Sequence, residues 1–221
     1  MMSDVSEQAM RIAVVEAAQA LFRNQVMSHT GHANLSVRVA PEEMLLTVDG
    51  MVRDLTPERM ARVHLDGRVQ SGDLDPTNAE IVAMHAEVYR ARDDVGGIIH
   101  THSPNLLAFA MANRVLPCRY EALLRFGQAV PVPVVPWAPR GSERSVGGII
   151  EAIRQHPGTQ AVLLGNHGVL AFAASPQAAA ALVTVLEEAA QAELAAEDLG
   201  GAQDFPPGAL DEVRRAMARV R

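Results

Sequence analysis

Cysteine, positive charge and long apolar runs are all scarce in this sequence of 221 residues. Its single cysteine, Cys118, excludes an intrachain disulfide framework and a zinc site built from several thiolates. A chain with so little cysteine is typical of the reducing cytoplasm, where we expect it to act. The first ten residues contain early acids and no apolar stretch, and no apolar run reaches about 18 residues. We therefore expect neither a secretory signal nor a membrane-spanning helix.

Basic residues number 19 against 26 acidic ones, which gives a formal net charge of -7. Surfaces that bind nucleic acids usually carry net positive charge, so we predict no nucleic-acid partner. The apolar fraction of 48% excludes general disorder. Since no repeat or low-complexity linker divides the chain, we expect residues 1–221 to form a single domain that is long enough to bury a core.

Helical and strand patterns are interspersed along the chain. Apolar residues recur at helical spacing in five segments: 5–27, about 78–92, 104–112, 142–155 and 176–199. Strand patterns occupy 34–39, 44–48, a short polar stretch near 63–70, 95–102, 160–166 and 169–172. The proline-rich segment 130–136 predicts an irregular or edge strand. This mixture predicts an α/β or α+β fold whose central sheet is mixed or antiparallel.

Three histidines stand in apolar strand contexts. His100 and His102 are two residues apart, so their imidazoles project from the same side of a strand. His167 follows another apolar run and precedes a glycine, where a strand turns. Three histidines with one open position are a standard ligand set for catalytic zinc. The alternative for each is a core histidine with its hydrogen bonds satisfied, and spacing alone does not bring His167 to the other two.

Glu80 allows two interpretations. Thr77 and Glu80 fit a capping box at the start of a helix, which would give the glutamate a purely structural role. A carboxylate twenty residues before His100 could equally be a general acid/base. His85 lies farther along on an otherwise apolar helix face, and we predict that it belongs to the core.

Several short segments occur in an order that resembles the class II aldolase/adducin family, and the resemblance covers nearly the whole chain. Each segment is common by itself, and the combination is specific. The segments are 31–38 (GHANLSVR), 49–50 (DG), Glu80, 100–104 (HTHSP), 141–143 (GSE) and 166–168 (NHG).

The resemblance implies a three-layer αβα domain with a nine-stranded, mostly antiparallel sheet, assembled as a cyclic homotetramer with sites between subunits. It implies that His100, His102 and His167 bind Zn²⁺ and that Glu80 is the acid/base. The implied reaction breaks a C–C bond of a small hydroxy-ketone or sugar-derived substrate, with the metal stabilising the enediolate that remains.

The resemblance also assigns substrate contacts, with departures from the usual pattern. Asn34 is retained, whereas Asp49-Gly50 and Asn78-Ala79 stand where phosphorylated-sugar aldolases hold phosphate with Thr-Gly and Ser-Ser. Asp49 places a negative charge there and so argues against a phosphate substrate. For the tyrosine that a neighbouring subunit contributes in the family, direct alignment gives Glu121, with Tyr120 beside it.

Other activities stay open at this stage. Decarboxylation is the nearest alternative, because it leaves the same kind of metal-stabilised enolate. A sugar-phosphate epimerase fits less well, since relatives of that type carry Asp at the Glu80 position. A non-catalytic interaction module of the adducin type lacks the metal histidines, so the intact set of three argues against it.

Overall fold

One continuous sheet forms the centre of the protein in the computed structural model, which describes residues 4–218. The strand order is β4-β3-β2-β1-β5-β8-β7-β6. Every neighbouring pair is antiparallel except β6 and β7, which are parallel. The strands are β1 (Ala33–Ala40), β2 (Glu43–Thr47), β3 (Met60–His64), β4 (Val69–Ser71), β5 (Gly97–Thr101), β6 (Val134–Val135), β7 (Ala161–Leu164) and β8 (Gly168–Ala173).

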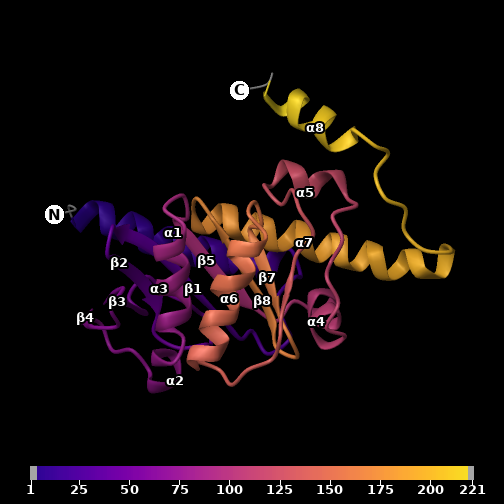
Figure 1. Cartoon of the computed structure of the whole chain (residues 1–221). Coiled ribbons are helices and arrows are strands. Elements are labelled where there is room, and N and C mark those ends of the chain that lie inside the picture. The colour runs from indigo at the N-terminus through magenta and orange to yellow at the C-terminus, as the bar shows by residue number, and fades with distance from the viewer. Residues whose placement is uncertain (1–3, 219–221) are drawn as a thin grey trace.

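Helices cover both faces of this sheet, as Figure 1 shows. One face packs against α1 (Asp4–Arg23), α4 (Pro104–Met111) and α7 (Pro176–Ala196), and the other against α3 (Val82–Ala91) and α6 (Glu143–Gln155). The remaining helices are short or peripheral: α2 (Pro76–Ala79), α5 (Glu121–Arg125), the 3-10 turn η1 (Glu197–Leu199) and α8 (Ala209–Ala218). The predicted three-layer αβα fold with a mostly antiparallel sheet is confirmed. Within residues 4–218 the sheet has eight strands, one fewer than the resemblance implies.

Strand alternation separates the two cores. In β5, Ile99 belongs to the core under α1 and α7, whereas Ile98 belongs to the core under α3 and α6. His100 is two residues from Ile98, so it projects toward the α3 and α6 side. In β1, Leu35 points toward α1 and α7, which leaves Asn34 on the same side as His100. The alternation thus assigns the polar site residues to one face of the sheet.

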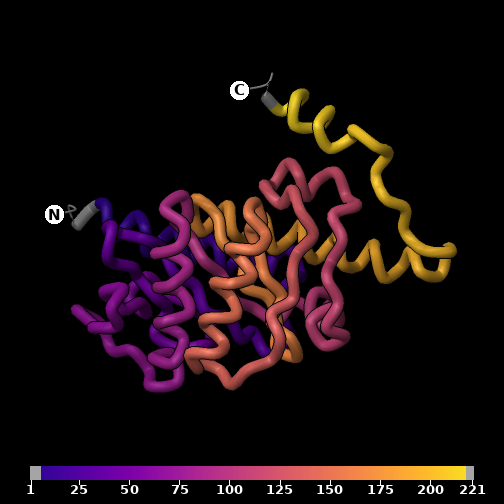
Figure 2. Tube along the Cα trace, in the orientation of Figure 1, coloured from indigo at the N-terminus to yellow at the C-terminus, as the bar shows by residue number. Residues whose placement is uncertain are grey.

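The proline-rich segment ends in β6, which is the last strand of the sheet. This edge position was predicted from its prolines, because a proline has no N–H to give to a neighbouring strand. Beyond α7 the chain turns back, and α8 reaches α5, as the trace in Figure 2 shows. The sequence patterns did not predict α5 or α8. Among residues 4–218, no helix has the length and apolar character needed to cross a bilayer.

Candidate active site

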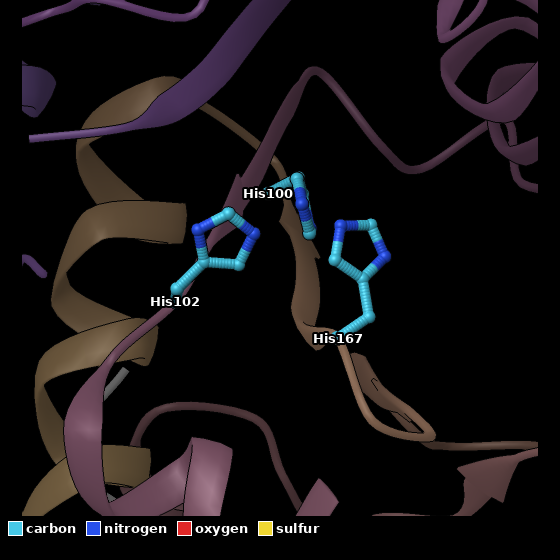
Figure 3. Close-up of side chains that lie close together, drawn as sticks. All are labelled: His100, His102 and His167. Carbon is cyan, nitrogen blue, oxygen red and sulfur yellow. The ribbon is translucent and has the colours of Figure 1, made fainter. Parts of the chain in front are cut away.

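The three predicted histidines meet where β5 ends and β8 begins. One ring nitrogen from each lies within 4.8 Å of the others. The ring centroids of His100 and His167 are 4.6 Å apart, and those of His102 and His167 are 5.2 Å apart. Figure 3 shows the rings gathered around a common space, with His167 approaching from a different segment than the other two. The fold thus brings His167 to the strand pair, which spacing in the sequence left open.

The turn before β8 makes this approach possible. Asn166 adopts a left-handed backbone with φ of 55°. Gly168 follows His167, and a Cβ added there would lie 2.5 Å from the Thr101 carbonyl oxygen and 2.7 Å from Cδ2 of His102. Only glycine therefore allows β8 to begin this close to the end of β5.

The hydrogen bonds leave nitrogen lone pairs available to a metal. Nδ1–H of His100 donates to the Val169 carbonyl oxygen at 2.9 Å, which fixes the tautomer and leaves Nε2 as an acceptor. Nε2 of His102 is buried and has no hydrogen-bond partner within residues 4–218. A buried nitrogen without a partner is costly in a folded protein unless something external completes it. These residues therefore fit a bound metal ion.

Electrostatics keep the same histidines neutral. Burial, followed by the repulsion of His167 and His102, holds the pKa of His100 well below its usual value. Burial also lowers the pKa of His102 to about 4, with nearby positive groups acting in the same direction. The pKa of His167 is lowered by burial first and by Arg140 second. Neutral imidazoles are the form that binds metals, so no proton has to be displaced near neutral pH.

Glu80 does not belong to a capping box, and that interpretation is wrong. The helix cap is Asp75, whose carboxylate accepts the Thr77 N–H at 2.8 Å, with Pro76 in the first turn. Helix α2 then ends at Glu80 itself. The Glu80 side chain is 57% exposed, and its carboxylate lies 4.0 Å from Nε of Arg140. The carboxylate is therefore accessible from solvent beside Arg140.

Glu80, Arg140 and His167 line one small crevice. The loop before α6 reaches Glu80 through Gly141, which has φ of +72° and whose added Cβ would lie 2.7 Å from the Glu80 carbonyl oxygen. Nη2 of Arg140 donates to the Thr77 carbonyl oxygen at 2.5 Å. No sequence pattern singles out Arg140, although it directly precedes the Gly-Ser-Glu segment that carries part of the resemblance.

Asn34 lies beside the histidines as the cross-strand partner of His100. Its Oδ1 accepts Nε2–H of His85 at 2.7 Å, and Nδ1 of His85 accepts the Ser36 hydroxyl at 2.7 Å. Ser36 Oγ in turn lies 2.9 Å from the Tyr89 hydroxyl. All of these side chains are buried, so the prediction of a core His85 is confirmed. The chain holds the Asn34 amide in one orientation.

Asp49 has its own partners, which removes the argument against a phosphate. Its carboxylate accepts the Met51 N–H at 2.8 Å and forms an ion pair with Arg59. The negative charge that the sequence places at this turn is therefore compensated within the chain, and it no longer excludes an anionic substrate.

A fourth histidine, His32, packs so closely on Gly50 that no side chain fits at position 50. A Cβ at Gly50 would lie 2.2 Å from Cε1 of His32. The His32 ring in turn stacks on His102, with centroids 5.6 Å apart and planes 8° apart. His32 belongs to the segment 31–38, and no local sequence pattern indicates that its ring reaches the metal-ligand candidates.

The two remaining predicted substrate residues occupy different environments. Asn78 is fully buried, and its Nδ2 donates to the Thr47 carbonyl oxygen at 2.8 Å, tying α2 to β2. Tyr120 is the N-cap residue of α5 and is 41% exposed. In Figure 1, α5 and α2 lie at opposite edges of the molecule. The chain by itself therefore does not bring Tyr120 to the crevice beside Glu80.

Known proteins resemble this chain over most of its length. The Class II Aldolase and Adducin N-terminal domain matches residues 12–194. A 3-oxo-tetronate 4-phosphate decarboxylase of Escherichia coli (strain K12) is 30% identical, over 86% of this chain and 89% of its own. A 5-deoxy-D-ribulose 1-phosphate aldolase of Bacillus thuringiensis serovar kurstaki is 27% identical over 72% and 71%. The structure of an L-fuculose 1-phosphate aldolase superposes with a TM-score of 0.85 at 23% identity, covering 99% and 98% of the two chains.

Proposed function

Since the chain belongs to the Class II Aldolase and Adducin N-terminal domain family, we propose that it is a zinc-dependent lyase. Its substrate is a small hydroxy-ketone or sugar-derived molecule, in which it cleaves a C–C bond. The observation that carries this proposal is the convergence of three neutral histidines, one of them with a buried nitrogen that lacks any partner. The aldolases and decarboxylases among its relatives support a lyase.

His100, His102 and His167 would hold the metal. Three imidazoles suit zinc among the common biological metals and leave one position for a substrate. When bound, zinc polarises adjacent substrate oxygens and stabilises the enediolate that remains when a C–C bond breaks. The hydrogen bond from His100 to the Val169 carbonyl keeps that imidazole oriented for the role.

Glu80 is the proposed acid/base. Its carboxylate has no cap to serve, is more than half exposed, and shares a crevice with His167. In aldol cleavage the protonated carboxyl group of Glu80 delivers its proton to the substrate carbon left by the broken C–C bond and becomes a carboxylate. In the reverse direction the carboxylate removes that proton. Asn34, held by His85, supplies an amide beside the same site.

Decarboxylation is the second candidate, and the relatives named as decarboxylases favour it specifically. Both reactions leave a carbanion stabilised in the same way, so they differ in the product that is released. We expect the zinc-loaded protein to release an aldehyde from phosphorylated or unphosphorylated hydroxy-ketones. Release of CO₂ from sugar-derived acids, without any aldehyde product, would instead assign the decarboxylase activity. Absence of both products across such a panel would refute the lyase proposal.

We also propose a cytoplasmic homotetramer, in which Tyr120 of one subunit completes the site of its neighbour. This arrangement is supported by the exposure of Tyr120 and by its place at the start of α5, which lies away from α2 in Figure 1. Analytical ultracentrifugation should show a tetramer at micromolar concentration. A monomer under those conditions would remove Tyr120 from the site.

A further inference from the structure

We propose that Arg140 binds an oxyanion of the substrate, a carboxylate or a phosphate, next to the three histidines. The inference rests on the proposed function and deepens it, because it assigns a negative charge to the substrate near its reacting end. It also makes Arg140 a specificity-determining residue for this site.

The backbone around Arg140 is built against Glu80. Gly141 has the left-handed conformation that favours glycine, and its Cα packs on the Glu80 backbone more closely than any side chain would permit. Ser142 then caps α6 by accepting the Ser145 N–H at 3.1 Å. The start of α6 therefore fixes the loop from one end. The hydrogen bond from Arg140 to Thr77 fixes it from the other.

The guanidinium of Arg140 retains unused donors. An arginine side chain has five N–H groups in a planar fork, and Thr77 accepts one of them. The Glu80 carboxylate lies 4.0 Å away, beyond hydrogen-bond distance. In contrast, Arg59 and Arg62 each contact a carboxylate directly. Arg140 therefore keeps N–H donors that can bind a ligand.

The positive charge of Arg140 is directed at the histidine group. It lines the same crevice as Glu80 and His167. Its side chain is 33% exposed, so a substrate can reach it. A planar guanidinium beside a small crevice is suited to binding carboxylate or phosphate oxygens in pairs.

The alternative is that Arg140 only tethers the loop to α2. Binding of simple anions to the zinc-loaded protein separates the two roles, because it requires no turnover. Calorimetric titrations with oxalate and with inorganic phosphate would be compared between the wild-type protein and Arg140→Met. We expect the dissociation constant of at least one anion to rise by about 10-fold or more in the variant. The anion that is affected identifies a carboxylate or a phosphate as the group recognised.

Two further variants sharpen the comparison. Arg140→Lys keeps the charge but not the fork, so it should lie between the wild type and Arg140→Met. Arg144→Met removes a positive charge from the same segment, where Arg144 donates to the Trp137 carbonyl oxygen. Its affinity for both anions should stay within about twofold of wild type. If Arg140→Met does not fold, as judged by metal content and thermal unfolding, Arg140→Gln replaces it.

The proposal is overturned if wild-type protein binds neither anion, or if the Arg140 variants bind both as the wild type does. It is also overturned if Arg144→Met weakens binding as much as Arg140→Met. Failure of the proposed function has a different signature, namely a wild-type protein that carries no metal or shows no lyase product. The two failures can therefore be told apart.

Discussion

His85 and His102 lie on the same side of the sheet, yet their hydrogen bonding is opposite. Both ring nitrogens of His85 have partners inside the protein, Asn34 on one side and Ser36 on the other. Nε2 of His102 is buried and has none. Burial keeps both rings neutral, with the pKa lowered to about 3 for His85 and to about 4 for His102. The difference therefore lies in which nitrogens are satisfied. A histidine whose two ring nitrogens both have partners inside the protein, such as His85, supports the fold. A histidine with an unpartnered nitrogen, such as His102, is available to a ligand.

Replacing His102, whose Nε2 has no partner, should have the largest effect on metal binding and activity. We expect His102→Ala to lose the bound metal and all measurable lyase activity, because one of three ligands is gone, while the protein stays folded. Metal analysis and circular dichroism of the purified variant test this. His156→Ala, which removes an exposed histidine, is the matched control and should keep its metal. Stoichiometric metal in His102→Ala would remove this residue from the site.

Glu80→Gln should separate chemistry from metal binding. The amide cannot exchange a proton, so we expect turnover to fall by roughly 100- to 10,000-fold, with metal content near wild type. Solvent exchange of a donor's α-proton, followed by NMR, measures the proton step without full turnover. The variant should also unfold at the same denaturant concentration as the wild type, because the side chain that caps the N-terminus of α2 is that of Asp75 and not that of Glu80. Exchange at the wild-type rate would leave the site without its proposed base.

Replacing His85, whose two ring nitrogens both have partners, should instead destabilise the fold. His85→Ala leaves Oδ1 of Asn34 and the hydroxyl of Ser36 buried without their partner, and each such group costs about 1–3 kcal/mol. We expect the free energy of unfolding to fall by about 3 kcal/mol in urea denaturation, with the metal retained. Tyr89→Phe, which removes only the hydroxyl beyond Ser36, should cost less. Loss of metal with unchanged stability in His85→Ala would contradict the contrast between the two histidines.

The pH dependence of stability should show the same contrast on a smaller scale. An unfolded histidine takes up a proton below about pH 6.5, whereas folded His85 does so only near pH 3. Between these values the unfolded chain binds the extra proton, so stability rises with pH and is lost as pH falls from about 6.5 toward 3. His85 should contribute about 1.4 kcal/mol per pH unit in that window.

Replacing His85 by glutamine tests this contribution, since an amide can hydrogen-bond but does not titrate. Urea denaturation of the metal-free proteins at pH 6.0 and 5.0 should show a smaller loss of stability in His85→Gln than in the wild type. The other histidines titrate in both proteins and cancel in the difference. Equal slopes would mean that His85 is not held neutral by the fold.

Several features of the site could be predicted from short sequence patterns, and others could not. The capping box at Thr77 and Glu80 was misassigned because Asp75-Pro76, two residues earlier, is a stronger helix start. The sequence shows Asp49 as an unpaired charge, because nothing local indicates that Arg59 forms an ion pair with it. Arg140 and His32 went unnoticed because their roles depend on the residues that face them across the fold. The roles of Asn78 and Tyr120 as substrate contacts stay predictions.

The sequence by itself determined the layered α/β fold and the common face of His100 and His102, because strand alternation and helical periodicity are local properties of the chain. It also determined the family, through the order of its short segments. Only the tertiary structure decided that His167 joins the pair, because β5 and β8 are neighbours in the sheet although β6 and β7 lie between them in the sequence. It likewise decided that the Glu80 side chain is exposed and lies beside Arg140. Distances between remote segments depend on sheet order and packing, which no local periodicity specifies.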